Sequence, residues 1–253
     1  MASRALLIGL NYVDTPESKL NGCINDVNNM ANYLGKMFPC MVCDIVTDET
    51  NKTDTTAQGI VKKLYELAVK SHSEDLEFVW IHYSGHGSYV KDTSGDELDG
   101  QDECIVPSDY KTAGLVSDDI LQSLFAHFNP KTRVLCVFDC CHSGTLGDVK
   151  YCWDNPEKPT IENIKCRVKA KVITLSGCMD KQTSADAYNV MNDSNFTGAL
   201  TSCLILSLKE VPVLRDDAFN LVRSIRQKLK DKGFDQYPKL CSSHNLAFDK
   251  RVF

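Results

Sequence analysis

The sequence RVLCVFDCCHSG, residues 133–144, joins an apolar run to two adjacent thiols and a closing Ser-Gly pair. The apolar part predicts a buried strand over residues 133–138. A second stretch, FVWIHYSGHG at residues 78–87, has the same design, with an imidazole where the first has a thiol. Because parallel strands present the residues that follow them at one edge of a sheet, Cys141 and His86 are expected to lie close together.

The rest of the chain alternates between strand and helix patterns. The predicted strands are 5–10, 41–46, 78–83, 133–138 and 171–176, and the predicted helices are 24–34, 60–68, 118–128, 198–208 and 218–229. This order predicts an α/β fold with a mainly parallel central sheet and helices on both faces. Ligands bind such sheets at the carboxyl ends of the strands, where both motifs lie.

Composition and charge exclude several classes of protein. The 253 residues are 43% hydrophobic and 25% charged, as in ordinary globular domains. A net charge of −6 without any Lys/Arg block argues against nucleic-acid binding. No apolar stretch reaches the roughly 18 residues of a membrane-spanning helix, so no membrane partner is expected. Twelve scattered cysteines do not resemble a small disulfide scaffold, and a reducing, cytoplasmic location fits them best.

Cys141 is the candidate nucleophile. A free thiol with a pKa of about 8.5 needs a base or a positive neighbour to ionise at neutral pH. Cys140 is an alternative that the spacing leaves open, because adjacent strand residues face opposite ways and only one can meet the histidine. Both thiols are also compatible with a purely structural role at the end of a core strand.

His86 is the candidate base, and its flanking glycines permit a tight turn and close approach of a substrate. His82 lies within the predicted strand and is expected to be a core residue, whereas His142 should point away from the thiol that it follows. No third orienting residue is evident, so a dyad is expected. The backbone N–H groups of Gly87 and Cys141 are candidate donors to a developing oxyanion.

Acidic residues form a second group. The stretch GDELDGQDE at 95–103 is dense in carboxylates, and Asp118 and Asp119 follow at a predicted helix start. Solvated loops and helix N-termini favour such residues without any ligand. The same residues suit a hard cation such as Ca²⁺, which takes six to eight oxygen ligands, although the EF-hand pattern is not matched.

Together these segments resemble the metacaspases, which are caspase-like cysteine peptidases. The matching motifs are GCIND (22–26), HYSGHG (82–87), DGQDECIVP (99–107), DCCHSG (139–144) and SGCMD (176–180). They span nearly the whole chain in the order expected for that family. The resemblance implies a caspase-hemoglobinase fold in one domain, 1–253, with a large-subunit-like region at 1–145, an exposed loop at 146–169 and a small-subunit-like region at 170–253.

The resemblance also implies an activity. It predicts a calcium-dependent endopeptidase that cleaves protein or peptide substrates after Arg or Lys, with His86 and Cys141 as the dyad. It places Asp26, Ser84 and Asp139 in an acidic pocket for the basic P1 side chain. A carboxylate pair suits that role, because a buried cation needs charge and hydrogen-bond partners.

Calcium is the implied cofactor, since the family's calcium positions fall on four aspartates: Asp102, Asp118, Asp119 and Asp148. The chain departs from the family in carrying Cys140 where serine is common. Neither a long prodomain nor a long linker between the subunit regions is expected, which suggests a compact, prodomain-free, type I-like enzyme. The resemblance implies a monomer. Self-cleavage is expected near one of the basic residues around the 146–169 loop: Lys150, Lys158, Lys165, Arg167 or Lys169.

Two alternatives compete with this interpretation. One is a related peptidase of the same clan that prefers Asp or Asn at P1, which the acidic pocket candidates disfavour. The other is a catalytically idle, calcium-responsive interaction protein, which the intact dyad disfavours.

Overall fold

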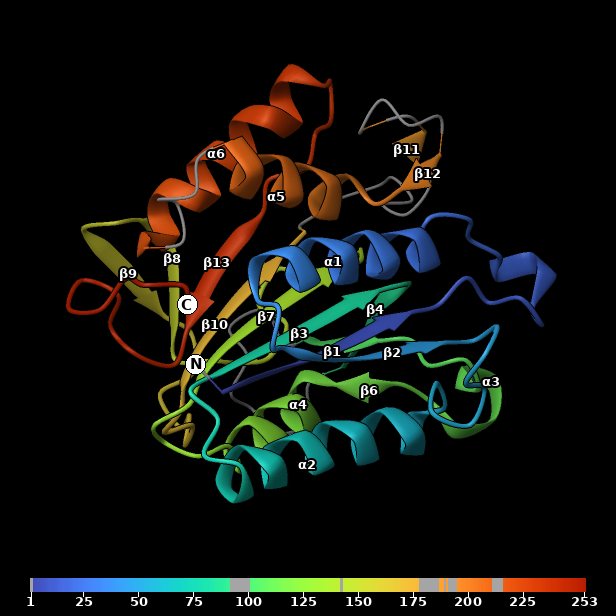
Figure 1. Ribbon diagram of the computed structural model, residues 1–253, viewed down its shortest axis with the longest axis horizontal. Coiled ribbons are helices and arrows are strands. Elements are labelled where there is room, and N and C mark those ends of the chain that lie inside the picture. Colours follow the sequence, from blue (N-terminus) through green and yellow to red (C-terminus); the bar gives the residue numbers. More distant parts are fainter. Residues whose placement is uncertain are drawn as a thin grey trace.

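A computed structural model describes residues 2–91, 101–141, 143–177, 187–188, 190, 195–210 and 216–253. Part of the acidic stretch (92–100), His142, and residues 178–180 of the SGCMD motif lie outside those residues. The centre of the molecule is an eight-stranded sheet with the strand order β2-β1-β3-β7-β10-β13-β8-β9 (Figure 1).

The central sheet is parallel in its first five strands. Its members are β1 (Ser3–Gly9), β2 (Val42–Thr47), β3 (Phe78–Ser84), β7 (Arg133–Asp139), β8 (Tyr151–Asn155), β9 (Lys158–Ile161), β10 (Lys171–Ser176) and β13 (Lys239–Ser242). Strands β2, β1, β3, β7 and β10 pair in parallel, and β13, β8 and β9 continue the sheet antiparallel. Every residue of β3 is buried, because helices cover both faces of the parallel part. The predicted α/β fold with a mainly parallel sheet is confirmed.

Helices form a layer on each face of the sheet. Helices α1 (Cys23–Met37), α5 (Ala199–Glu210) and α6 (Ala218–Asp231) lie above it in Figure 1, and α2 (Ala57–Ser73) and α4 (Asp118–Phe125) lie below. Each helix turns an apolar stripe inward; α6, for example, buries Leu221, Ile225 and Leu229. These helices match the predicted ones within a few residues at each end. No helix in the described parts of the chain is both long and apolar enough to cross a bilayer.

Short strands and turns make up the smaller elements. Strands β4 (Gly87–Lys91), β5 (Gln101–Ile105) and β6 (Val116–Ser117) form a second sheet, β11 (Ala187–Tyr188) pairs with β12 (Phe196–Thr197), and η1 (Pro16–Ser18) and α3 (Tyr110–Ala113) are single turns. The sequence did not predict β4 and β5, because they are short, partly exposed and polar. Since β4 starts directly after His86, this second sheet borders the motif that carries the histidine.

The segment 146–169 differs from the expected exposed loop. Strands β8 and β9 form a hairpin that extends the central sheet, and Leu146, Val149 and Trp153 are buried. The Trp153 indole N–H donates to Ser242 Oγ at 2.7 Å and so ties the hairpin to β13. The high lysine and proline content hid this strand signal. Outside the two strands, residues 146–150, 156–157 and 162–169 have no helix or strand.

Candidate active site

The ends of β3 and β7 bring the two sequence motifs together. The two strands are parallel neighbours, and their last residues, Ser84 and Asp139, are partners in the register. His86 and Cys141 each follow this pair by two residues. A Cβ on Gly87 would overlap the carbonyl oxygen of Cys141, so the loops after β3 and β7 touch where only glycine fits. The structure therefore places both loops in contact at the carboxyl edge of the sheet, as the sequence predicts.

Burial separates the two adjacent thiols. The side chain of Cys140 is fully buried, and its Sγ lies 3.2 Å from the position of a Cβ on Gly87. Burial raises the pKa of the Cys140 thiol well above its ordinary value. Cys141 is partly exposed. Since a nucleophile must ionise and be reached by substrate, the geometry favours Cys141 over Cys140.

A backbone carbonyl orients the imidazole of His86. The Nε2 atom of His86 lies 2.8 Å from the carbonyl oxygen of Ser18. Because a carbonyl can only accept a hydrogen bond, Nε2 carries the proton and Nδ1 is the basic nitrogen of the neutral ring. The sequence analysis found no third orienting residue, since a main-chain carbonyl leaves no sequence signal.

His82, the alternative base, is a buried core residue, as expected. Burial lowers the pKa of its imidazole to about 3, so the ring is neutral. Its Nε2 lies 3.0 Å from Thr201 Oγ1, and that hydroxyl donates to Asp139 Oδ2 at 2.7 Å. His82 therefore supports Asp139 through Thr201 and has no role at the thiol.

The three residues expected in the acidic pocket meet at one point. Asp26, in the first turn of α1, and Asp139, at the end of β7, are both fully buried. The Ser84 hydroxyl donates to Asp26 Oδ2 at 2.5 Å, and Gly198 N donates to Asp26 Oδ1 at 2.7 Å. A Cβ on Gly198 would overlap Asp139 Oδ2 and lie 2.6 Å from Asp26 Oδ2. The two carboxylates therefore lie close together beside Gly198.

Among the described residues, no positively charged side chain is paired with these two carboxylates. Burial raises the pKa of Asp139 to about 6. Burial, and then repulsion by Asp139, raise the pKa of Asp26 well above its ordinary value. Asp139 Oδ1 is buried and has no hydrogen-bond partner among the described residues. A guanidinium or an ammonium group would supply both the missing charge and the missing donors.

Two further residues contact these carboxylates and were not predicted from the sequence, Gly198 and Thr201. Both lie at the start of α5, in a stretch that reads as an apolar core helix. The backbone N–H of Thr201 donates to Asp139 Oδ2 at 2.8 Å, in addition to the hydroxyl. The first turn of a helix, with its unpaired N–H groups, stabilises this carboxylate. Gly198, which directly precedes the apolar helix α5, was the sequence signal that could have indicated this contact.

The four aspartates expected to bind calcium lie around α4. Asp102 and Asp118 are buried on β5 and at the first position of α4. The carboxylate of Asp118 accepts from Asp119 N at 2.8 Å and from Glu103 N at 2.9 Å. The chain's own backbone thus satisfies both oxygens of Asp118.

Asp148 lies beside the middle of α4 and is also buried. Its backbone has a left-handed φ of 44°, and its carboxylate accepts from the side-chain amides of Gln122 and Asn163. Carboxylate oxygens suit Ca²⁺ chemically. In the described parts of the chain, however, no three His, Cys, Asp or Glu side chains are arranged to hold a metal ion. The expected ligands gather around one helix without forming a closed site.

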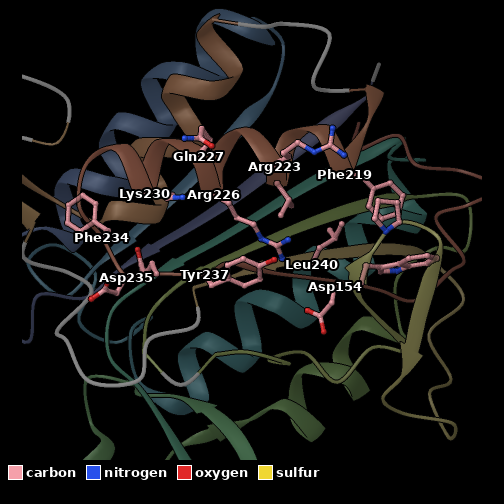
Figure 2. A pocket seen from close by; sticks show the side chains of 14 residues that line it. Asp154, Phe219, Arg223, Arg226, Gln227, Lys230, Phe234, Asp235, Tyr237 and Leu240 are labelled. Carbon is pink, nitrogen blue, oxygen red and sulfur yellow. The ribbon is translucent and has the colours of Figure 1, made fainter.

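A separate cavity of about 490 Å³ lies between α6, β8 and the segment before β13 (Figure 2). Trp153 and Leu240 form part of its apolar wall, and Arg226 stacks on Tyr237 with its guanidinium 3.8 Å from the ring centroid. Its described lining contains no Cys, Ser or His side chain. The cavity is therefore separate from the loops after β3 and β7 that carry the candidate thiol and imidazole.

Comparison with known sequences agrees with this geometry. Residues 3–150 match the family model described as "Metacaspase, peptidase C14 domain". Metacaspase-2 of Trypanosoma brucei brucei is 36% identical over 265 residues, which cover 98% of this chain and 75% of that protein. Metacaspase-1 of Meyerozyma guilliermondii is 30% identical over 294 residues, which cover 95% of this chain and 69% of that protein.

Comparison with solved structures gives the same fold. A crystal structure of a protein from Geobacter sulfurreducens matches with a TM-score of 0.68 and 25% identity, covering 100% of this chain and 98% of that one. The shared architecture is the caspase-like α/β fold with a mostly parallel central sheet. Family, relatives and fold agree that this chain is a cysteine-type endopeptidase and belongs to the metacaspase family.

Proposed function

We propose that this metacaspase hydrolyses peptide bonds after arginine or lysine, with Cys141 as nucleophile and His86 as base. The observation that supports this specificity is the buried pair Asp26 and Asp139. The Oδ1 atom of Asp139 has no hydrogen-bond partner among the described residues. A buried carboxylate of this kind is stabilised by a paired cation that also donates hydrogen bonds. A basic P1 side chain supplies that cation.

The chemistry follows from the arrangement of the two loops. The Nδ1 atom of His86 accepts the proton of the Cys141 thiol, and the thiolate sulfur forms a bond to the substrate carbonyl carbon. The electron pair of the C=O bond moves to oxygen, where the backbone N–H groups of Gly87 and Cys141 stabilise it. Collapse of this intermediate breaks the C–N bond, and the leaving amine takes the proton from His86. Water, deprotonated by the same imidazole, then attacks the acyl carbon, the C–S bond breaks, and the released Cys141 sulfur takes the proton back from His86.

The charge of the pocket argues against the rival specificities. An aspartate at P1 would bring a third carboxylate next to Asp26 and Asp139, and repulsion is strong where water is excluded. An asparagine would leave the charge of the pair unbalanced. Arginine fits best, because its planar guanidinium can donate to two carboxylates at once.

We further propose that Ca²⁺ binds around α4 through Asp102, Asp118, Asp119 and Asp148. Three of these four side chains are buried, and buried carboxylates favour a compensating cation. The donors that now satisfy Asp118 and Asp148 must be exchanged for the ion, so binding is expected to rearrange this helix end. Calorimetric titration of the purified protein with CaCl₂ tests the proposal, and Asp118→Asn should weaken the binding about tenfold through loss of one charge.

Self-processing is proposed in the irregular segment 162–169. A peptidase binds its substrate as an extended segment whose backbone N–H and C=O groups are free. In a strand within a sheet those groups are already paired. Lys158 belongs to β9, and Lys150 lies immediately before β8, whereas Lys165, Arg167 and Lys169 are exposed and lie outside any helix or strand. Replacing these three with alanine should abolish self-cleavage, while replacing Lys158 should not. A fragment pattern unchanged in the triple variant would contradict this assignment.

A panel of fluorogenic peptides that differ only at P1 tests the proposed function. Wild type should cleave the arginine and lysine peptides and leave the aspartate and asparagine peptides intact, with and without CaCl₂ as separate arms. Cys141→Ala should abolish cleavage, and Cys140→Ser should retain it because that buried thiol takes no part. Preference for aspartate or asparagine would overturn the pocket assignment. Absence of any Cys141-dependent turnover in both calcium arms would favour the idle interaction protein.

A further inference from the structure

Two buried tyrosine hydroxyls contact the backbone of His86, and the chemistry above gives them no role. Tyr12 lies in the loop between β1 and α1, and Tyr83 lies in β3. Their side chains are 2% and 1% exposed, and their Oη atoms are 3.2 Å apart. Burial raises the pKa of both phenols well above the ordinary value, so both hydroxyls keep their protons. Each can therefore donate one hydrogen bond and accept others at any physiological pH.

The Tyr12 hydroxyl is inserted into a β-ladder at His86. Gly87 and Ile105 are partners in the antiparallel pair of β4 and β5, so the next pair outward is His86 with Val106. One bond of that pair is direct, because Val106 N donates to His86 O at 3.2 Å. The reciprocal bond passes through the phenol: His86 N donates to Tyr12 Oη at 2.9 Å, and Tyr12 Oη donates to Val106 O at 2.7 Å.

The Tyr83 hydroxyl contacts both atoms of the direct hydrogen bond between Val106 N and His86 O. Its Oη donates to His86 O at 2.7 Å and accepts from Val106 N at 3.2 Å. Both hydroxyls and all four backbone groups of His86 and Val106 are thereby satisfied. Gly85 leaves the space for this arrangement, since a Cβ there would lie 2.6 Å from Tyr83 Oη and 3.1 Å from Tyr12 Oη.

Tyr12 also contacts the imidazole itself. The ring centroids of Tyr12 and His86 are 4.7 Å apart with an interplanar angle of 38°, within the range of favourable aromatic pairs. Tyr12 holds a left-handed φ of 53°, which is uncommon for a residue other than glycine. Thr15 N donates to Tyr12 O at 2.9 Å and closes the turn that keeps this conformation. Ser18, whose carbonyl holds Nε2 of His86, belongs to the same loop.

We propose that Tyr12 is the positioning residue of His86, and that its inserted hydroxyl and its ring together aim Nδ1 at Cys141. The inference rests on the roles proposed above for His86 and Cys141. Without the hydroxyl, His86 N loses its acceptor, whereas Val106 O keeps a second donor, Tyr83 Oη at 3.1 Å. His86 N then either moves toward Val106 O or stays unpaired, and we expect both outcomes to displace the imidazole. Tyr83 matters less for aim, because the direct bond from Val106 N to His86 O survives its loss.

The test compares Tyr12→Phe with Tyr83→Phe, since each variant removes one buried hydroxyl and keeps the ring. A merely structural role predicts similar losses in both. Positioning predicts that kcat on an arginine peptide falls roughly 10- to 100-fold in Tyr12→Phe and only about threefold in Tyr83→Phe. KM should change little in both, because neither hydroxyl touches the Asp26 and Asp139 pocket. Tyr65→Phe, on the exposed face of α2, serves as the neutral control.

A second readout needs no substrate. The rate at which iodoacetamide alkylates Cys141 reports its thiolate. Measured over a range of pH as an alkylation profile, this rate should be lower at neutral pH in Tyr12→Phe than in wild type. The proposal is overturned if Tyr12→Phe and Tyr83→Phe have the same kcat and the same alkylation profile. If wild type cleaves no arginine peptide but the alkylation profile still shifts, the proposed function fails while the positioning role stands.

Should Tyr12→Phe not fold, Gly85→Ala tests the same hydroxyl positions by adding a methyl group next to them. Its added methyl group displaces both hydroxyls without removing either. The expected result is the same loss of kcat with unchanged KM and the same shift of the alkylation profile. Wild-type values of both in a folded Gly85→Ala protein would overturn the proposal.

Discussion

Two groups of buried aspartates in this molecule differ in how their oxygens are satisfied. In the pair Asp26 and Asp139, burial raises both pKa values, and one oxygen of Asp139 has no partner among the described residues. Around α4, backbone N–H groups satisfy Asp118, and amide side chains bind Asp148. On the functions proposed above, the first group needs a cation to balance its charge, whereas Asp118 and Asp148 already have hydrogen-bond donors without one. The number of hydrogen-bond donors around a buried carboxylate thus distinguishes the two groups. The pair Asp26 and Asp139 could accept a cation directly, whereas Asp118 and Asp148 would first have to give up their present donors.

The largest expected effect is that of Asp139→Asn on cleavage. Removing one member of a buried charge pair typically costs 3–5 kcal/mol, so kcat/KM on an arginine peptide should fall by roughly 10²- to 10³-fold. Steady-state kinetics of the two proteins measure it, with Asp235→Asn as the control for loss of an exposed acid elsewhere. Retained preference for arginine and lysine in Asp139→Asn would remove this pair from substrate recognition.

Gly198→Ala should have the next largest effect. The new Cβ would overlap Asp139 Oδ2 and lie 2.6 Å from Asp26 Oδ2, so it closes the space that a basic side chain needs. We expect KM for an arginine peptide to rise by about tenfold or more, as for a displaced charge-assisted hydrogen bond. Gly35→Ala in α1 is the matched control, because its Cβ would meet no atom within 4 Å. Equal kinetics in the two variants would contradict the pocket.

Substrate binding should weaken in acid because Asp139 titrates. Its pKa of about 6 means that the carboxyl is neutral below that pH and charged above it. Agmatine, an arginine analogue without a scissile bond, should inhibit less well as pH falls, with its inhibition constant rising up to about tenfold per pH unit below pH 6. Asp139→Asn should be inhibited only weakly at every pH, and any remaining pH dependence should come from Asp26, whose pKa burial also raises. A wild-type inhibition constant that stays flat from pH 8 to pH 5 would rule out a titrating carboxyl in the pocket.

The smallest effect is on stability, and its sign differs between the two groups. A carboxyl whose folded-state pKa is raised makes the protein less stable as pH rises from the unfolded value through the folded one. Asp139→Asn should therefore be more stable than wild type at pH 8, by about 1–3 kcal/mol, with the gain vanishing near pH 4. Asp118→Asn loses one of two backbone hydrogen bonds and should be less stable by about 1–2 kcal/mol. Urea unfolding at both pH values measures this, and the same sign in both variants would contradict the comparison.

The sequence predicted what lies in long, buried elements. Strands β1, β3, β7 and β10 read as continuous apolar runs because the parallel sheet is covered on both faces. The hairpin of β8 and β9 did not, since it lies at the edge of the sheet, its strands are short, and lysine and proline occur in β9 and in the turn before it. In the site, side chains with their own chemistry, such as Cys141 and Asp139, were identifiable. Ser18 and Gly198 were not, because they act through a backbone carbonyl and through the absence of a side chain.

Mapping a covalent arginine probe tests the central claim most directly. Wild-type protein is treated with a peptidyl-arginine acyloxymethyl ketone, digested, and examined by mass spectrometry for the modified cysteine among the twelve in the chain. The account predicts one adduct, on Cys141, that agmatine suppresses and that is nearly absent in Asp139→Asn. An adduct on Cys140, or equally fast labelling by the aspartate analogue of the probe, would contradict it.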